Sequence, residues 1–334
     1  MKAFLSRWRH RPAPQATGAA SFDIALALYT DVGPVRDHNE DCIAALNAPW
    51  PGHPGDRTAL VALADGMGGH AAGELASRLA VEAALQAFGG LGGAANDRLH
   101  AALAAANRAV YEHAQSDAAW QGMGTTLLLF APTDGGAHFA WVGDSRLYRL
   151  RAGQIERLTR DDTLVMGLLS RGLIDASDVP GHPDHSVLTQ AVGTHAAIPF
   201  PHVEGPVALA EGDRFLLCSD GIHDVVGDAD LAQALQAATP DEALQQIHAL
   251  ALRHGADDNL SIGVVHVNAP AAPARAARGT RTDVEVSTWM RRRPPGSMRA
   301  RRRSAATVSP SASAKAAWAR CSAPSTRCSS ARSR

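Results

Sequence analysis

Two patterns of apolar and polar residues follow one another along this chain from about residue 21 to residue 267. Seven short apolar runs, bounded by glycine, proline or acidic residues, are typical of β-strands. They are residues 23–30, 58–65, 124–132, 137–144, 146–153, 213–220 and 260–267. Three longer runs have apolar residues three or four positions apart and predict helices at residues 72–88, 96–115 and 240–255. Groups of strands with helices between them favour an α+β domain over a strictly alternating α/β fold.

The connection between the fourth and fifth apolar runs is very short. Only Gly143, Asp144 and Ser145 separate the apolar segments that end at Val142 and begin at Arg146. Small and acidic residues of this kind are typical of tight turns. We therefore expect the two strands to form a hairpin.

Composition divides the chain into an acidic body and a basic tail. Residues 1–270 carry 17 Lys and Arg against 31 Asp and Glu, whereas residues 271–334 carry 15 Lys and Arg against two acids. The tail is rich in Arg, Ser, Ala and Pro and has no apolar periodicity, so we predict that it is disordered and assign it no partner. The expected organisation is a loose leader at 1–20, a globular domain at 21–268 and the tail at 269–334.

Several broad classes of protein are disfavoured. Four cysteines in 334 residues are too few for a disulfide framework and have no metal-site spacing. No apolar run approaches the 18 residues or so that a transmembrane helix needs. The first residues are basic but lack the apolar centre of a signal peptide, so we expect a cytoplasmic protein.

The stretch LVALADGMGGHAAGE, residues 60–74, places a glycine cluster between a predicted strand and a predicted helix. Such a loop can bind phosphate through its backbone amides, and Gly66, Gly68 and Ala71 match the loose dinucleotide pattern. A dinucleotide site, however, has an acidic residue at the end of a second strand about 20 residues later. Here that region is the predicted helix, which disfavours a nucleotide and directs attention to Asp65.

Acidic residues stand at the ends of several predicted strands. They are Asp65, Asp144 and Asp220 just after apolar runs, Asp257 and Asp258 just before one, and Glu40 and Asp41 in RDHNED after the first run. One Asp-Gly pair is usually only a turn, but five acidic clusters could meet at one edge of a sheet. Clustered carboxylates repel one another, and Mg²⁺ or Mn²⁺ prefers oxygen ligands of this kind. The sequence therefore predicts a metal site.

Seven motifs occur in a familiar order: RDHNED, ADGMGGHAAGE, GMGTT, WVGDSRLYRLRAGQIERLTRDD, VLTQAVGT, LLCSDGIHD and DDNLSIGVV. Together they resemble the PPM (PP2C-type) metal-dependent Ser/Thr protein phosphatases, in particular the bacterial single-domain branch. The resemblance spans about residues 24–267. It implies an α+β fold, the PP2C-like α-β-β-α sandwich, in which helices flank two central antiparallel sheets.

The resemblance also implies a site with two Mn²⁺ or Mg²⁺ ions and a third, weaker ion. It assigns metal binding to Glu40, Asp41, Asp65, Gly66, Asp144, Asp220 and Asp258. Asp65 would bridge the two main ions, Gly66 would offer its carbonyl, and Asp144 would serve the third. Arg36 would bind the substrate phosphate and, with Asp65 and Asp220, form the catalytic set. Asn259 would support Asp258.

The activity implied is hydrolysis of phosphoserine and phosphothreonine in proteins. A hydroxide that bridges the metals would attack phosphorus directly, and the enzyme would reverse the action of a partner Ser/Thr kinase. No nucleic-acid or membrane partner is required. The alternative is a catalytically weak member of the same fold that binds phosphoproteins in signalling; the complete acidic set favours the enzyme.

The chain departs from the family at two positions. Some relatives have a histidine, a candidate proton donor, where this chain has Met67; His70 nearby is expected to be only a loop residue. Many relatives also have histidine where this chain has Asp162. The resemblance places residues 164–190 in a variable flap near the site, a candidate for substrate selection.

Overall fold

The computed structural model describes residues 22–49, 56–69, 71–179 and 181–269. The predicted leader, His70 and the tail beyond residue 269 lie outside these ranges, so the domain boundaries remain predictions. Among the described helices, none combines the length and apolar composition that a bilayer crossing needs.

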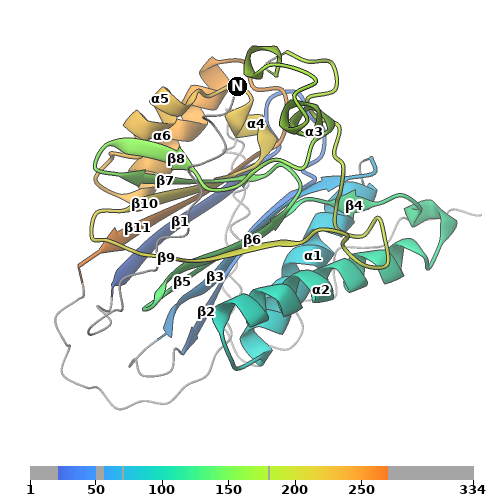
Figure 1. Cartoon of the computed structure of the whole chain (residues 1–334), viewed down its shortest axis with the longest axis horizontal. Helices are drawn as coiled ribbons and strands as arrows, with labels where there is room; N and C mark the ends of the chain where they lie inside the picture. Colours follow the sequence, from blue (N-terminus) through green and yellow to red (C-terminus); the bar gives the residue numbers. More distant parts are fainter. Residues whose placement is uncertain (1–21, 50–55, 70, 180, 270–334) are drawn as a thin grey trace, which may run out of the picture. The chain divides into compact units, whose positions relative to one another are not determined.

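Two antiparallel sheets form the centre of the described chain (Figure 1). The first, sheet A, contains in spatial order β1 (Asp23–Asp31), β11 (Leu260–Asn268), β10 (Arg214–Cys218), β7 (Arg146–Arg151) and β8 (Gln154–Arg157). The second, sheet B, contains β2 (Asp41–Pro49), β3 (Asp56–Met67), β5 (Leu127–Thr133), β6 (Gly136–Val142) and β9 (His202–Val207), with the short β4 (Gly124–Thr125) paired to β3.

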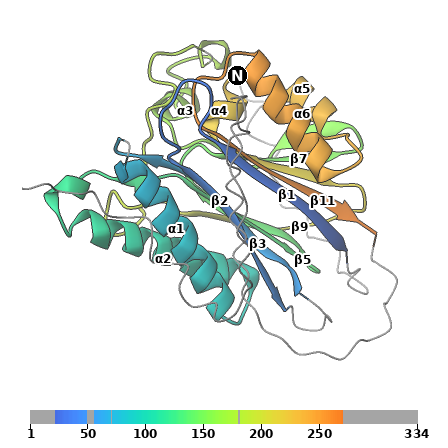
Figure 2. The ribbon, with the colours of Figure 1, turned by 180° about the vertical axis from the view of Figure 1, so that it is seen from behind.

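Helices cover the outer face of each sheet. The long helices α1 (Ala71–Gly90) and α2 (Ala95–Ala114) pack on sheet B, and α4 (Asp220–His223), α5 (Asp228–Ala234) and α6 (Pro240–Arg253) pack on sheet A. Figure 2 shows α6 lying along β1 and β11. Helix α3 (Leu164–Ser170) and the 3₁₀ turns η1 (Ala118–Trp120) and η2 (Ala176–Asp178) lie in connections. The predicted α-β-β-α sandwich is confirmed.

Three apolar layers hold the sandwich together. Between the sheets, Phe130 of β5 and Phe215 of β10 contact each other with their rings 4.8 Å apart, and both are fully buried. Under α1, Ala76, Ala80 and Ala84 are fully buried, because small side chains let the helix lie close to sheet B and α2. The high alanine content of the chain thus serves helix packing on one face.

Most predicted elements are confirmed, since each of the seven apolar runs contains a strand and each of the three periodic runs forms a helix. The predicted hairpin is wrong. Strand β6 belongs to sheet B and β7 to sheet A, so the link at Gly143 and Asp144 crosses between the sheets. Phe139 and Leu147 enter the same core from opposite sides, and Gly143, at φ +100, allows the sharp change of direction.

Candidate metal centre

The acidic residues predicted from the sequence lie at one end of the sandwich. Strand β3 ends there and β2 begins there, and the antiparallel register places Asp41 directly opposite Asp65. On sheet A, β10 ends and β11 begins at this end, next to Asp220 and Asp258. The expectation that the acids share one edge of a single sheet is therefore corrected: both sheets contribute, and the crossover between them carries Asp144.

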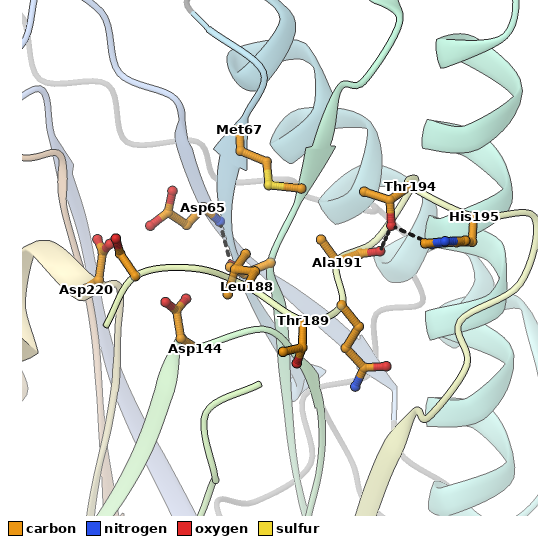
Figure 3. A pocket seen from close by; sticks show the side chains of 12 residues that line it. Asp65, Met67, Asp144, Leu188, Thr189, Ala191, Thr194, His195 and Asp220 are labelled. Carbon is orange, nitrogen blue, oxygen red and sulfur yellow. Dashed lines mark hydrogen bonds between the residues drawn. The ribbon is translucent and has the colours of Figure 1, made fainter. Parts of the chain in front are cut away.

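A pocket of about 380 Å³ opens at this end of the molecule. Figure 3 shows the carboxyl groups of Asp65, Asp144 and Asp220 directed toward one space, with Thr194 and His195 on the far side of the pocket. Met67, Thr126, Ser186 and the segment 188–191 complete its lining. The pocket thus has one acidic side and one neutral side.

Hydrogen bonds to the backbone fix the position of Asp65. Its amide donates to the Thr126 hydroxyl (2.9 Å), and its carbonyl accepts from the Thr126 amide and the Thr125 hydroxyl (both 2.8 Å). Burial, together with the neighbouring Asp41, Asp220 and Asp144, raises the pKa of the Asp65 carboxyl well above its usual range. The local fold therefore holds this carboxyl where ionisation is costly.

The other acids of the cluster experience the same effect. Burial is the main cause that raises the pKa of Asp41 to about 7, with Asp220 adding to the shift, although the Ser219 hydroxyl donates to its Oδ2 at 2.8 Å. Burial likewise raises the pKa of Asp144 and of Asp220. One carboxylate oxygen of Asp41 and one of Asp220 are buried without a hydrogen-bond partner.

The loop between β1 and β2 carries Arg36 and Glu40 and is held by Asn259. The Asn259 side chain accepts from the Glu40 amide (2.8 Å) and donates to the carbonyls of Val32 and His38 (both 2.9 Å). Arg36, whose side chain is 53% exposed, donates to Asp258 Oδ2 at 2.7 Å. Asn259 is thus a positioning residue for the whole loop. The family resemblance predicted only that it would support Asp258.

Two glycines allow Glu40 to lie close to the main chain. The Gly66 amide donates to the Glu40 carbonyl at 3.1 Å, and a Cβ at Gly66 would come within 2.7 Å of that oxygen. A Cβ at Gly73, on the first turn of α1, would overlap the Glu40 carboxylate itself. A larger residue at Gly73 would displace the Glu40 side chain, and one at Gly66 would clash first with the Gly73 carbonyl and then with that of Glu40.

The chemistry of this cluster fits hard divalent cations. Asp41, Asp65, Asp144 and Asp220 gather oxygen ligands with raised pKa values and two orphaned oxygens, and a cation would compensate both. Among the described residues, no three His, Cys, Asp or Glu side chains are already arranged as a metal site. Arg36, Glu40, Asp41 and Asp258 also lie outside the lining of the pocket. The full ligand set therefore remains a prediction.

Both departures from the family pattern have a place in the structure. Met67 lines the pocket beside Asp65 (Figure 3) and carries no proton to donate. Asp162 lies behind the segment 188–191: its carboxylate accepts from the Gly143 amide (3.0 Å), the Gln190 amide group (2.8 Å) and His202 Nε2 (2.9 Å). It therefore connects the Asp144 crossover to the neutral side of the pocket.

Cysteine chemistry has no support in the described part of the chain. Cys42 and Cys218 are free thiols on β2 and β10. Burial raises the pKa of Cys42 to about 12 and also raises that of Cys218. Because the thiolate is the nucleophilic form, neither residue is suited to attack phosphorus.

Sequence reasoning missed the hydroxyls that orient the acids and the glycine that admits Glu40. Thr126 and Ser219 lie inside the predicted strand runs 124–132 and 213–220, near one end of each, but polar residues there have no distinctive spacing. Gly73 did offer a signal, because glycine costs about 1 kcal/mol inside a helix and is retained there for a reason such as close packing.

Comparison with known proteins gives consistent matches. The family model described as Protein phosphatase 2C matches residues 38–251. The serine/threonine protein phosphatase PstP of Mycobacterium tuberculosis is 39% identical over 250 residues, which make up 73% of this chain and 45% of that protein. A putative protein phosphatase 2C-type of Streptococcus pyogenes is 32% identical over 247 residues, 72% of this chain and 96% of that protein.

A solved structure is similar over the same region. The catalytic domain of serine threonine protein phosphatase PstP, in complex with two manganese ions, has 34% sequence identity and a TM-score of 0.63. The match covers 74% of this chain and 100% of that one. The described sandwich therefore corresponds to a catalytic domain, although the chain spans less than half of the full-length mycobacterial relative.

Proposed function

This chain belongs to the protein phosphatase 2C family, and from that premise we propose that it hydrolyses phosphoserine and phosphothreonine in proteins with Mn²⁺ or Mg²⁺ as cofactor. The observation that carries the proposal is the buried acidic cluster of Asp41, Asp65, Asp144 and Asp220, whose pKa values are raised by burial and by one another. Crystals of the PstP catalytic domain hold two manganese ions, which supports the same cofactor here.

The acids have a role that neutral residues could not take. Two divalent cations bound at this end would supply Lewis acidity and a nucleophile at neutral pH. Asp65 and Asp220 would hold these ions at the pocket, with Asp41 beside them, and Asp144 would hold a weaker third. Glu40, the Gly66 carbonyl and Asp258 would complete the set, since each lies on a segment that reaches this end.

Arg36 would bind the phosphate of the substrate. Its planar guanidinium matches two phosphoryl oxygens, and its exposure leaves it free to change partner. Its present partner, Asp258, is one of the proposed metal ligands. Binding of the cation by Asp258 and of phosphate by Arg36 would thus exchange one ion pair for two complementary contacts.

The substrates we propose are phosphoproteins made by a Ser/Thr kinase of the same regulatory circuit. The mycobacterial relative and the solved PstP catalytic domain are named as serine/threonine protein phosphatases, which supports this class of substrate. A catalytically weak, phosphoprotein-binding role is the competing proposal. The two differ in turnover, because a binding module needs the phosphate contact but not a complete acidic cluster.

The decisive experiment measures phosphate release from a phosphothreonine peptide by the full chain. We expect hydrolysis with Mn²⁺, none with EDTA, and at least about a hundredfold loss in Asp220→Ala. The melting temperature of the same samples should rise with Mn²⁺. The corresponding gain in unfolding free energy is about 2.7 kcal/mol at a hundredfold excess of Mn²⁺ over Kd. That rise should be absent from Asp220→Ala. Peptide binding without turnover in Mn²⁺ would instead establish the binding module.

A further inference from the structure

Phe200 is an exposed aromatic residue close to the pocket, bound through its backbone to Gln190 of the lining but not itself part of that lining. It is 75% exposed, the largest exposed fraction among the large apolar side chains in the described ranges. Single exposed apolar residues are common on protein surfaces and need no explanation by themselves. What sets Phe200 apart is the way in which its backbone is held.

The side chain of Gln190 binds both backbone groups of Phe200. Its Nε2 donates to the Phe200 carbonyl (2.9 Å), and its Oε1 accepts from the Phe200 amide (3.2 Å). Gln190 itself is buried, lines the pocket, and donates to Asp162. The exposed ring is thus attached to the pocket wall through one fixed side chain.

Two prolines restrict the same backbone further. Pro199 and Pro201 flank Phe200, which fixes φ on either side and keeps the residue before each proline extended. Next along the chain, His202 stacks on Trp141 at 4.5 Å and donates to Asp162. A backbone that is fixed before binding leaves less entropy to be lost when its side chain is covered, as in the aromatic anchors of binding surfaces.

We propose that Phe200 is a specificity-determining residue that packs against an apolar side chain of the phosphoprotein substrate, a few positions from the phosphorylated residue. This inference rests on the proposed function. The chain that carries a phosphoserine or phosphothreonine into the pocket must continue past it. The Gln190 hydrogen bonds and the register of β6 and β9, with Trp141 opposite His202, place the Phe200 backbone at this end of sheet B.

The test compares wild type with Phe200→Ser on phosphothreonine peptides in which one leucine is moved along an otherwise polar sequence. Wild type should show a KM about tenfold lower for one position of the leucine, and Phe200→Ser should lose this preference. The value of kcat, and the hydrolysis of a small aryl phosphate that cannot reach Phe200, should change by less than about twofold. Phe200→Tyr, which keeps the ring, should retain the preference.

The matched control is Leu252→Ser, an exposed apolar residue on α6 that is 42% exposed. It should leave every KM unchanged, and both variants should melt as wild type does. The inference about Phe200 would be overturned if the wild-type KM did not depend on the leucine position, or if Phe200→Ser kept the same dependence. The proposed function would stand in both cases. Failure of wild type to hydrolyse the aryl phosphate with Mn²⁺ would overturn the proposed function as well.

Discussion

Strand β10 has an acidic residue at each end, and the two are satisfied in opposite ways. Asp213, just before the strand, is 1% exposed and accepts from Arg151 Nε (2.7 Å) and Nη2 (2.6 Å) and from the Ala210 amide (2.8 Å). Asp220, just after the strand, lies among Asp65, Asp258 and Asp224 and has a buried oxygen without a partner. The same short strand thus has an acid in an ion pair with Arg151 at one end and, among the described residues, an acid without an arginine or lysine partner at the other.

The contrast separates acids that support the fold from acids that serve chemistry. A buried carboxylate is tolerated when a guanidinium and backbone amides surround it. A cluster of carboxylates without a base is costly, and proteins keep such a cost where function needs it. Among the ion pairs of the described residues, none joins Asp41, Asp65, Asp144 or Asp220 to an arginine or lysine, and this, rather than burial, distinguishes these four acids from Asp213.

The largest effect is expected for Asp65→Asn. We expect phosphatase turnover in Mn²⁺ to fall by roughly a thousandfold or more. This is a larger fall than the loss of one hydrogen-bond donor to a developing charge usually causes. The same change removes one of several repelling carboxyls, so the variant should melt a few degrees higher than wild type in EDTA.

Steady-state kinetics and calorimetry on the same preparation check both statements. A variant that keeps wild-type turnover would remove Asp65 from the site. One that loses turnover but melts lower in EDTA would show that Asp65 also supports the fold, and the contrast between the two ends of β10 would fail.

The opposite result is expected for Asp213→Asn. Loss of the charge beside Arg151 should lower the free energy of unfolding by about 3 kcal/mol and the melting temperature by roughly 6–12 °C. Turnover measured well below the transition should stay within about twofold of wild type, because the residue lies at the far end of β10. Urea unfolding gives the first quantity and initial rates the second; a large loss of turnover at full folding would show that the two ends are coupled.

The smallest effect concerns His266, which pairs with Arg214 across β10 and β11 near the Asp213 end. It is buried with Nε2 unpartnered, and burial followed by the charge of Arg214 lowers its pKa to about 4. Between pH 6.5 and 4 the unfolded chain holds a proton that the folded chain does not, so stability falls as pH falls through this window.

We therefore expect wild type to lose on the order of 1–2 kcal/mol more than His266→Leu between these limits. The difference between the two proteins isolates His266, because both carry the acidic cluster. Urea unfolding at several pH values measures it. Parallel pH profiles of the two proteins would show that His266 gains no proton on unfolding.

Much of the fold could be predicted from apolar periodicity, but β2, β8 and β9 were not predicted and one connection was misassigned. The runs at 58–65 and 260–267 are bordered by turn residues and form β3 and β11. Strand β9 was missed because HVEGPV has no apolar run and takes its place from β6. The crossover at Gly143 was mistaken for a hairpin because local sequence does not state which sheet supplies the partner of a strand.

The residues of the candidate site also fall into those that could be predicted from the sequence and those that could not. Asp65, Asp144 and Asp220 could be expected together because each follows an apolar strand, and the structure places all three on one pocket. Gln190 was expected near the site only through the family resemblance, as part of the flap at 164–190. Thr194 and His195 could not be expected there, because they lie in an irregular segment whose path depends on contacts such as that of Gly193 with Asn107. Side chains placed by strand geometry were accessible to sequence reasoning, and those placed by loop contacts were not.

The crossover from β6 to β7 has a consequence for how the proposed metal centre is assembled during folding. Since one sheet supplies Asp41 and Asp65, the other supplies Asp220 and Asp258, and the link between them carries Asp144, neither half holds a usable fragment of the centre. Under the proposed function, the metal ligands meet only once both halves have docked, so a partly synthesised chain that lacks β10 and β11 is expected to have no phosphatase activity.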